Sequence, residues 1–283
     1  MLSINTNKPA FNAATIAFKI SSDLEKTQMR MATGKKINSA ADNPAGLVIV
    51  KQLDSQIAGV EQAINNTKNG ISLIKTAENA LDEMNKLLEK AKKLTLDNLN
   101  ASTSAEAREA NQTEINNIVQ TINRIAQNTR FGTTNLLDGT FSNRRFQLGE
   151  GGSEFVTFSI SNMQATQIGV VTGNAYANLN ALDGLNSGTA NYSDVLAVIN
   201  DAINDVTAER GRLGAFQSNT LETNLNSLNE RRQQLLKSKG VIEDADMAEE
   251  SVTYNKQLAQ YQLALLTLQQ SNQRAGQILS LFG

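Results

Sequence analysis

The 283-residue sequence contains no cysteine and no histidine. Without cysteine the chain can form no disulfide, no thiolate nucleophile and no cysteine-based metal site. Without histidine it lacks the usual general base, the commonest zinc ligand and the Ser-His-Asp triad. Catalysis by carboxylates or lysines is still open to such a chain, but these absences argue against an enzyme. We therefore expect no catalytic site, no cofactor and no metal.

Proline and aromatic residues are also scarce. Only Pro9 and Pro44 occur, tryptophan is absent, and aromatic residues make up 5% of the chain. Proline destabilises a helix interior by about 3 kcal/mol, so a chain that lacks it after residue 44 can form very long helices. Few bulky side chains favour narrow seams between helices over a thick core. The expected fold is mainly α, an elongated rod of long helices and coiled coils with one small β-hairpin region.

Neither a charge excess nor a long apolar run is present. The chain has 26 basic and 28 acidic residues, a formal charge of −2, whereas nucleic-acid binding requires a basic face. Apolar runs such as residues 47–50 fall far short of the roughly 20 residues that span a bilayer. Residues 1–10 lack the features of a cleavable signal peptide. We predict no nucleic-acid partner, no membrane insertion, and either a cytosolic protein or export without a cleaved signal.

The two ends of the chain carry apolar heptads on weakly charged segments. Arg274 is the only charged residue after Lys256, and only Lys8 and Lys19 are charged among the first 22 residues. Since a solvated helix face normally carries charges, we expect the two ends to pair antiparallel and to be covered by other subunits. The alternative interpretation is that the heptads of the two ends form only a core within one chain. The predicted assembly seam consists of Ile20, Leu24, Met31, Leu258, Tyr261, Leu265, Leu268, Leu279 and Phe282.

Between the two ends the periodicity changes from helical to extended and back. Helical patterns cover residues 47–99, a stretch following the Ser- and Thr-containing loop at 100–104, and residues 193–237. Alternating apolar residues predict a β-hairpin near 144–160. Residues 149–152 (GEGG) fit its turn better than a phosphate loop, since no GKS or GKT follows. Residues 162–188 are expected to be loop.

Two further signals concern the helix ends and the domain organisation. We expect Gly240 and the acidic stretch 243–250 to interrupt the last helical region, with the acidic residues forming a first turn that complements the helix dipole. The predicted domains are an inner coiled-coil domain from residues 1–42 and 240–283, and a helical-bundle domain from residues 43–239.

Several motifs along the chain have counterparts in one known family, in the same order. Residues 31–46 (MATGKKINSAADNPAG) are similar to the SGLRINSAADDAAG block that opens flagellins. The other matching segments are 69–81 (NGISLIKTAENAL), 128–139 (NTRFGTTNLLDG), 210–225 (RGRLGAFQSNTLETNL), 242–249 (IEDADMAE) and 278–282 (ILSLF). Together they cover both terminal thirds of the chain, and as a set they are highly specific.

The resemblance implies a secreted structural subunit that polymerises with itself into the extracellular filament of the bacterial flagellum. It implies that the terminal arms, residues 1–42 and 240–283, form the inner coiled-coil domain of the filament. It also implies that the outer domains of larger flagellins are missing here. It also implies export through a type III apparatus. An export chaperone, a filament cap and hook-associated proteins would be partners.

The family's contact with the innate-immune Toll-like receptor 5 corresponds by motif alignment to Lys90, Leu94 and Glu114. The family has arginine where this chain has Lys90. Lysine lacks the planar bidentate donor of arginine, which counts against receptor recognition.

The main alternative within the same machinery is a hook–filament junction protein, which shares the terminal arms and a similar length. Pro44 slightly favours it, whereas the SLF ending and the complete INSAADNPAG block favour a filament subunit. A chemoreceptor-type signalling rod should contain membrane spans, and an enzyme domain on a helical scaffold is disfavoured by the missing histidine and cysteine.

Overall fold

The computed structural model describes residues 7–188 and 190–279, with side chains as far as Gln273. Long helices and short antiparallel strands confirm the mainly α fold with a small hairpin region. The helices are α1 (Lys8–Thr33), α2 (Pro44–Asn98), α3 (Ala105–Asn128), α4 (Tyr192–Phe216), α5 (Thr223–Glu243) and α6 (Met247–Leu279). The strands are β1 (Arg130–Phe131), β2 (Thr134–Asn135), β3 (Arg144–Gln147) and β4 (Phe155–Phe158).

The chain divides into two compact units. Unit 1 contains residues 1–57 and 233–283, and unit 2 contains residues 58–232. The sequence analysis set the limits at residues 42 and 240. The structural limits fall elsewhere because α2 and α5 each run without interruption from one unit into the other, so no loop marks the boundary.

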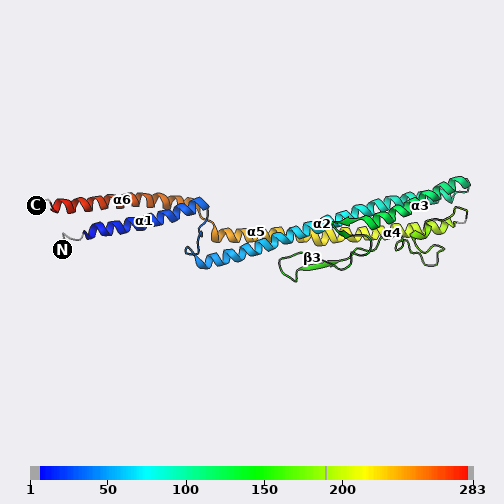
Figure 1. The fold of residues 1–283 in the computed structure, drawn as a ribbon, viewed down its shortest axis with the longest axis horizontal. Coiled ribbons are helices and arrows are strands. Elements are labelled where there is room, and N and C mark those ends of the chain that lie inside the picture. Colours follow the sequence, from blue (N-terminus) through cyan, green and yellow to red (C-terminus); the bar gives the residue numbers. More distant parts are fainter. Residues whose placement is uncertain (1–6, 189, 280–283) are drawn as a thin grey trace. The chain divides into compact units, whose positions relative to one another are not determined.

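Unit 1 contains an antiparallel pair of helices, α1 and α6 (Figure 1). Asn7 caps α1 by accepting a hydrogen bond from the Ala10 N–H (3.1 Å), and a proline follows in the first turn, where its missing N–H is harmless. The Asn7 amide also donates to the Ser271 carbonyl (3.1 Å). At the other end, Arg30 pairs with Glu250 (3.3 Å). These contacts give the antiparallel orientation predicted from the sequence.

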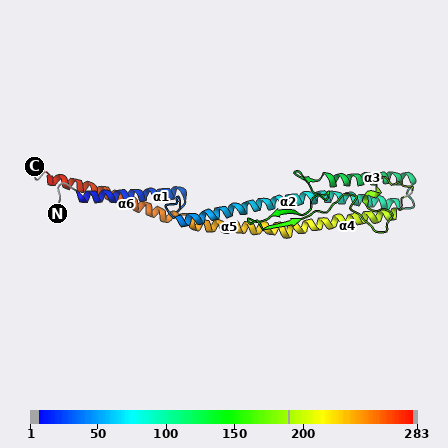
Figure 2. The same ribbon diagram turned by 60° about the horizontal axis from the view of Figure 1, so that its bottom comes forward.

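Unit 2 is built around a single hydrophobic core between α2, α3 and α4, which lie side by side in both views (Figures 1 and 2). α2 has 55 residues, about 80 Å at 1.5 Å per residue. Ser104 caps α3 by accepting from the Ala107 N–H (3.2 Å), as its loop composition predicted. Fully buried members include Ile74, Leu81, Met84, Leu88, Ile115, Ile122, Leu136, Leu137, Ile168, Leu179, Leu182 and Ile199.

The predicted hairpin is present. β3 and β4 pair antiparallel, with Phe146 opposite Val156 and residues 149–152 in the turn. The Phe158 ring stacks on Phe216 of α4 with centroids 4.0 Å apart, which holds the hairpin on the bundle. The shorter β1–β2 pair was not predicted, because two-residue strands are too short to show a period. Residues 162–188 are mostly irregular, as expected, with one 3₁₀ turn at Leu179–Leu182.

The last helical region differs from expectation at two places. α5 passes through Gly240 and ends at Glu243, so only residues 244–246 separate it from α6. The acidic first turn of α6 is confirmed by Glu249 and Glu250. The second difference is a π-helical segment, Gln217–Glu222, inside the stretch predicted as one continuous α-helix. A π-helical turn contains one more residue than an α-helical turn and does not end the helix. The spacing of the apolar residues along the sequence therefore does not reveal it.

Candidate functional site

The inner face of the α1–α6 pair is lined by small residues. Ala10, Ala13 and Ala17 are buried, and short side chains at these positions let two helix backbones approach closely. Three predicted seam residues continue the same face at heptad spacing: Ile20, Leu24 and Met31, all half-buried. In a single chain this stripe already contacts α6, so part of the predicted seam is covered within unit 1.

The α6 side of the pair follows a slightly different register from the predicted heptad. Leu258, Tyr261 and Leu268 are half-buried, but Leu265 is 38% exposed. Ala264 is half-buried in its place. Leu279 ends α6 without a described side chain, and Phe282 lies outside the described residues.

The outer faces of both helices expose large apolar side chains. Phe11 is 73% and Phe18 is 82% exposed on α1, and Leu263 and Leu266 are 62% and 56% exposed on α6. We call these four residues the outer apolar face. A shallow apolar hollow lies beside Phe18. Sequence reasoning missed the two phenylalanines, although their i, i+7 spacing on a sparsely charged helix was a usable signal.

Exposed aromatic and leucine side chains that gather on one helix pair mark an interaction surface. Each large apolar side chain that becomes buried contributes about 1.5–3 kcal/mol to association. The outer apolar face can therefore bind another weakly charged helical surface. It offers no group suited to bond-making chemistry.

The residues aligned with the innate-receptor contact come together on the surface of unit 2. The Lys90 ammonium pairs with the Glu114 carboxylate at 2.6 Å, which joins α2 to α3. Leu94 lies one helical turn beyond Lys90 on the same face and is half-buried against the core. Both charged side chains are about half exposed, so the pair is available to a partner and contributes little to stability.

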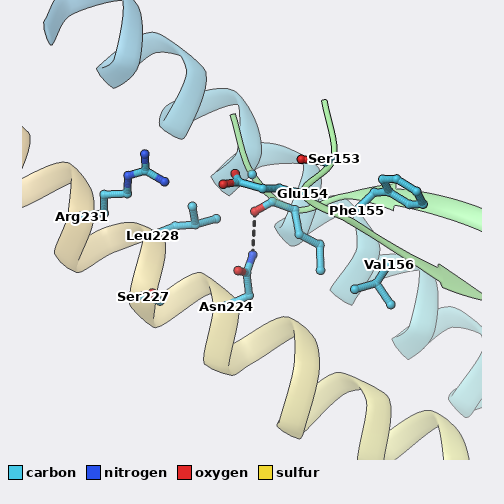
Figure 3. A pocket seen from close by; sticks show the side chains of 10 residues that line it. Ser153, Glu154, Phe155, Val156, Asn224, Ser227, Leu228 and Arg231 are labelled. Carbon is cyan, nitrogen blue, oxygen red and sulfur yellow. Dashed lines mark hydrogen bonds between the residues drawn. The ribbon is translucent and has the colours of Figure 1, made fainter. Parts of the chain in front are cut away.

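A groove of about 320 Å³ lies between the hairpin turn and α5 (Figure 3). The Asn224 amide donates to the Leu148 carbonyl (2.9 Å), and Arg231 forms an ion pair with Glu150 of the turn. Phe155 lines the groove and is 41% exposed. These polar contacts hold the hairpin turn on α5. We therefore interpret the groove as the space left along the edge where the hairpin packs on α5, and not as a ligand site.

Within residues 7–188 and 190–279, three or more His, Cys, Asp or Glu side chains nowhere gather in a way that could hold a metal ion. None of the helices in these ranges offers an apolar stretch of membrane-spanning length.

Two family models match the chain. Residues 4–142 match the bacterial flagellin N-terminal helical region, and residues 196–282 match the bacterial flagellin C-terminal helical region. The two matches include α1, α2 and α3 on one side and α5 and α6 on the other.

Similar proteins extend over nearly the whole chain. A flagellin of Bacillus subtilis is 31% identical over 98% of this chain and 99% of its own length. The flagellar filament 33 kDa core protein of Treponema phagedenis is 30% identical, with 98% and 99% covered. A solved structure of a putative flagellar hook-associated protein from Vibrio parahaemolyticus shares the fold, with a TM-score of 0.60 at 20% identity over 71% of this chain and 99% of that one. On the strength of the two family models and the full-length relatives, this chain belongs to the bacterial flagellin family.

Proposed function

We propose that this chain is the repeating subunit of a bacterial flagellar filament and polymerises with itself through its terminal helices. The observation that carries the proposal is the outer apolar face of the α1–α6 pair, which belongs to a chain of the flagellin family. A free subunit would leave Phe11 and Phe18 in water, and a second copy would cover them.

A helical polymer needs two different complementary surfaces on each subunit, because a contact that joins unlike patches propagates without closing. The outer apolar face supplies one of them, since apolar and neutral polar groups can be buried there without unpaired ions. The charged helices of unit 2 supply polar contacts, whose strength falls as salt rises.

The resemblance to flagellins supports a wider set of proposals. The chain would be secreted through a type III apparatus, would act outside the cell as filament, and would meet an export chaperone, a filament cap and hook-associated proteins. The role is structural rather than enzymatic. A hook–filament junction role is less supported, because the full-length relatives are filament proteins.

Innate-receptor binding at Lys90, Leu94 and Glu114 is a separate proposal based on the resemblance. The pairing of Lys90 with Glu114 supports it, since the two charges form one surface feature. Replacing Lys90 by arginine restores a bidentate donor and should strengthen binding of the receptor ectodomain, whereas Lys90→Ala should weaken it. Equal binding of both variants would remove these residues from the contact.

A charge placed on the outer apolar face tests polymerisation. Phe18→Asp should abolish filaments, because a carboxylate would have to be desolvated at the subunit contact. The α1–α6 pair should stay intact, since Phe18 is 82% exposed in the single chain. Gln28→Asp, at an exposed polar position of the same helix, is the matched control and should polymerise.

Light scattering followed by electron microscopy measures the outcome, and circular dichroism verifies folding of each variant. Filaments of normal length from Phe18→Asp would show that the outer apolar face is not an interface. A wild-type chain that forms no polymer on its own would favour the hook–filament junction role.

A further inference from the structure

Unit 2 contains three dipeptides in which an aspartate or asparagine precedes a glycine: Asn69–Gly70, Asp138–Gly139 and Asp183–Gly184. In such a pair the glycine nitrogen can attack the side-chain carbonyl carbon and close a five-membered imide ring, because glycine has no Cβ to crowd the ring. An amide loses ammonia more readily than a carboxyl group loses water. By sequence alone Asn69–Gly70 is therefore the most reactive of the three pairs.

The helix α2 protects the first pair. Asn69 and Gly70 lie in its interior, where the Gly70 N–H donates a helical hydrogen bond, so ring closure would have to break the helix locally. A Cβ on Gly70 would come within 3.2 Å of the Phe146 ring, which shows that the hairpin also covers this turn of α2. The pair that is most reactive by sequence is thus held in an unreactive conformation.

The carboxylate of the second pair is held by its neighbours. Asp138 accepts hydrogen bonds from the Asn135 amide (2.7 Å), the Thr140 N–H (3.0 Å) and the Thr140 hydroxyl (2.6 Å). Burial raises the pKa of Asp138, but these hydrogen bonds more than offset it and hold the pKa below its ordinary value. Ring closure needs the neutral carboxyl group, which this site disfavours. A Cβ on Gly139 would also lie 2.9 Å from the Asn162 Cβ, so the backbone has little room to turn.

The third pair lies at the surface, directly after the 3₁₀ turn Leu179–Leu182. Asp183 and Gly184 are both exposed, and the Asp183 carboxylate accepts a hydrogen bond at the surface from the Gln120 amide (3.2 Å). Within the part of the chain that the structure describes, the peptide group joining Asp183 to Gly184 makes no hydrogen bond. The Cβ direction of Gly184 is open to 4 Å. The ring closes only after ψ of Asp183 rotates from 125°, and no hydrogen bond of that peptide group opposes the rotation.

We propose that Asp183 is the site at which this chain converts to isoaspartate. The Gly184 nitrogen bonds to the Asp183 Cγ, and the carboxyl hydroxyl leaves with the proton of that nitrogen as water. Water that then adds at Cγ restores aspartate. Water that adds at the backbone carbonyl carbon breaks its bond to the nitrogen, which leaves the chain connected through Cγ and the α-carboxylate exposed. The reaction needs water alone and no enzyme.

The product has the composition of aspartate but carries one more carbon atom in the main chain. Leu182, directly before the site, is fully buried in the core of unit 2, and its carbonyl accepts from the Gln112 amide (3.4 Å). We therefore expect the 3₁₀ turn to stay in place and the exposed residues after Gly184 to take up the added length. Unit 2 should stay folded, so the modified form accumulates. This property belongs to the folded unit 2 and does not depend on polymerisation.

Ageing of the purified full chain at pH 6 and at pH 8 tests the proposal. Isoaspartate is quantified with an isoaspartate-specific methyltransferase and is located in peptides by electron-transfer mass spectrometry. We expect it at residue 183, at a level at least about tenfold above that at residues 69 and 138, which corresponds to a modest difference in reaction barrier. Formation should be faster at pH 6, where more of the carboxyl group is neutral. Circular dichroism verifies that the aged chain is folded.

Two variants and one change of conditions serve as controls. Asp183→Glu keeps the charge but would have to close a six-membered ring, so the signal at residue 183 should disappear. Asp183→Asn forms the same imide with loss of ammonia and should react faster, which is seen as a gain in mass. In guanidinium chloride the protection of α2 is lost, and Asn69 should become the most reactive position.

Three results would each overturn the proposal. The first is a background level of isoaspartate at residue 183 after ageing. The second is an equal or higher level at residue 69 or 138 in the folded chain. The third is an order of reactivity that is the same in guanidinium chloride as in the folded chain, since the fold would then have no part in selecting Asp183.

Discussion

At the scale of single residues, Gly169 shows how one position holds the irregular segment of unit 2 against α4. Its φ of +70° lies in the left-handed region, and an added Cβ would come within 2.7 Å of the Val198 carbonyl oxygen. Strain and clash therefore act together at this position, whereas Gly173, with φ +82°, has open space around its Cβ direction.

Gly169→Ala should lower the free energy of unfolding of unit 2 by roughly 2–4 kcal/mol, the sum of left-handed strain and overpacking. Gly173→Ala, which suffers only the strain, should lower it by about 1–2 kcal/mol. Urea denaturation of the full chain, followed by circular dichroism, measures both. Equal losses in the two variants would mean that the contact with Val198 carries no energy.

Asp205 should make unit 2 more stable, not less stable, as the pH falls, because its pKa is raised in the folded state. Burial raises the pKa of the Asp205 carboxyl, the Gly169 N–H that it accepts at 2.9 Å partly lowers it, and nearby Asp201 raises it further. Because the folded state holds the proton more tightly than the unfolded chain, this group adds stability as the pH falls through its raised pKa, and that stability is lost as the pH rises.

Asp205→Asn should therefore make unit 2 more stable at pH 7 and flatten its pH dependence above pH 4, since the amide oxygen can still accept the Gly169 N–H. Thermal unfolding between pH 4 and 7 measures this effect. A variant that is less stable than wild type at pH 7 would show that the charged carboxylate is favourable in the folded state.

At the scale of the elements, the α1–α6 pair depends on small residues facing the partner. Ala17 is 7% exposed, and a larger side chain there would push the helices apart, at about 1–3 kcal/mol for overpacking. Ala17→Leu should therefore make α1 and α6 more sensitive to limited proteolysis in the monomer.

Thr15→Leu is the control, because residue 15 is exposed on the other side of α1. It should leave the protease resistance of both helices unchanged. If Ala17→Leu were as resistant to proteolysis as wild type, α1 and α6 would not pack closely around Ala17 in solution.

Several elements could be predicted from the sequence, because their signals are local. The heptads marked α1 and α6, the lack of proline permitted the 55 residues of α2, and alternation around residues 149–152 marked the hairpin. The π-helical segment and the position of the α5–α6 break could not be predicted. At the break, the Lys36 N–H donates to the Glu243 carbonyl, a contact between residues far apart in the chain, and a π-helical turn leaves no mark in the apolar spacing.

At the scale of the whole molecule, the proposed assembly surface and the large hydrophobic core belong to different units. The large hydrophobic core lies between residues 73 and 221, within unit 2, and none of the α6 side chains that the structure describes, residues 247–273, belongs to it. Changes in α6 should therefore affect filament formation without unfolding unit 2.

Truncation that removes residues 257–283 should abolish filaments, because it deletes most of α6 and half of the outer apolar face. The thermal midpoint of unit 2 should stay within a few degrees of wild type, since a change of 1 kcal/mol shifts a domain of this size by about 2–4 °C. Electron microscopy and calorimetry give the two readouts. Filaments from the truncated chain would refute the role of α6 in assembly.

The sequence by itself determined the class of the protein, its long helices, its hairpin and its resemblance to flagellins, because periodicity, proline content and motifs are written in consecutive residues. Only the tertiary structure decided that Leu265 is 38% exposed while Ala264 is half-buried, that Lys90 meets Glu114, and that residues 34–36 pair with residues 243–245 beside the break in the helix. Each of these depends on the register with which segments far apart in the chain pack against one another, and a pattern of consecutive residues does not contain that register.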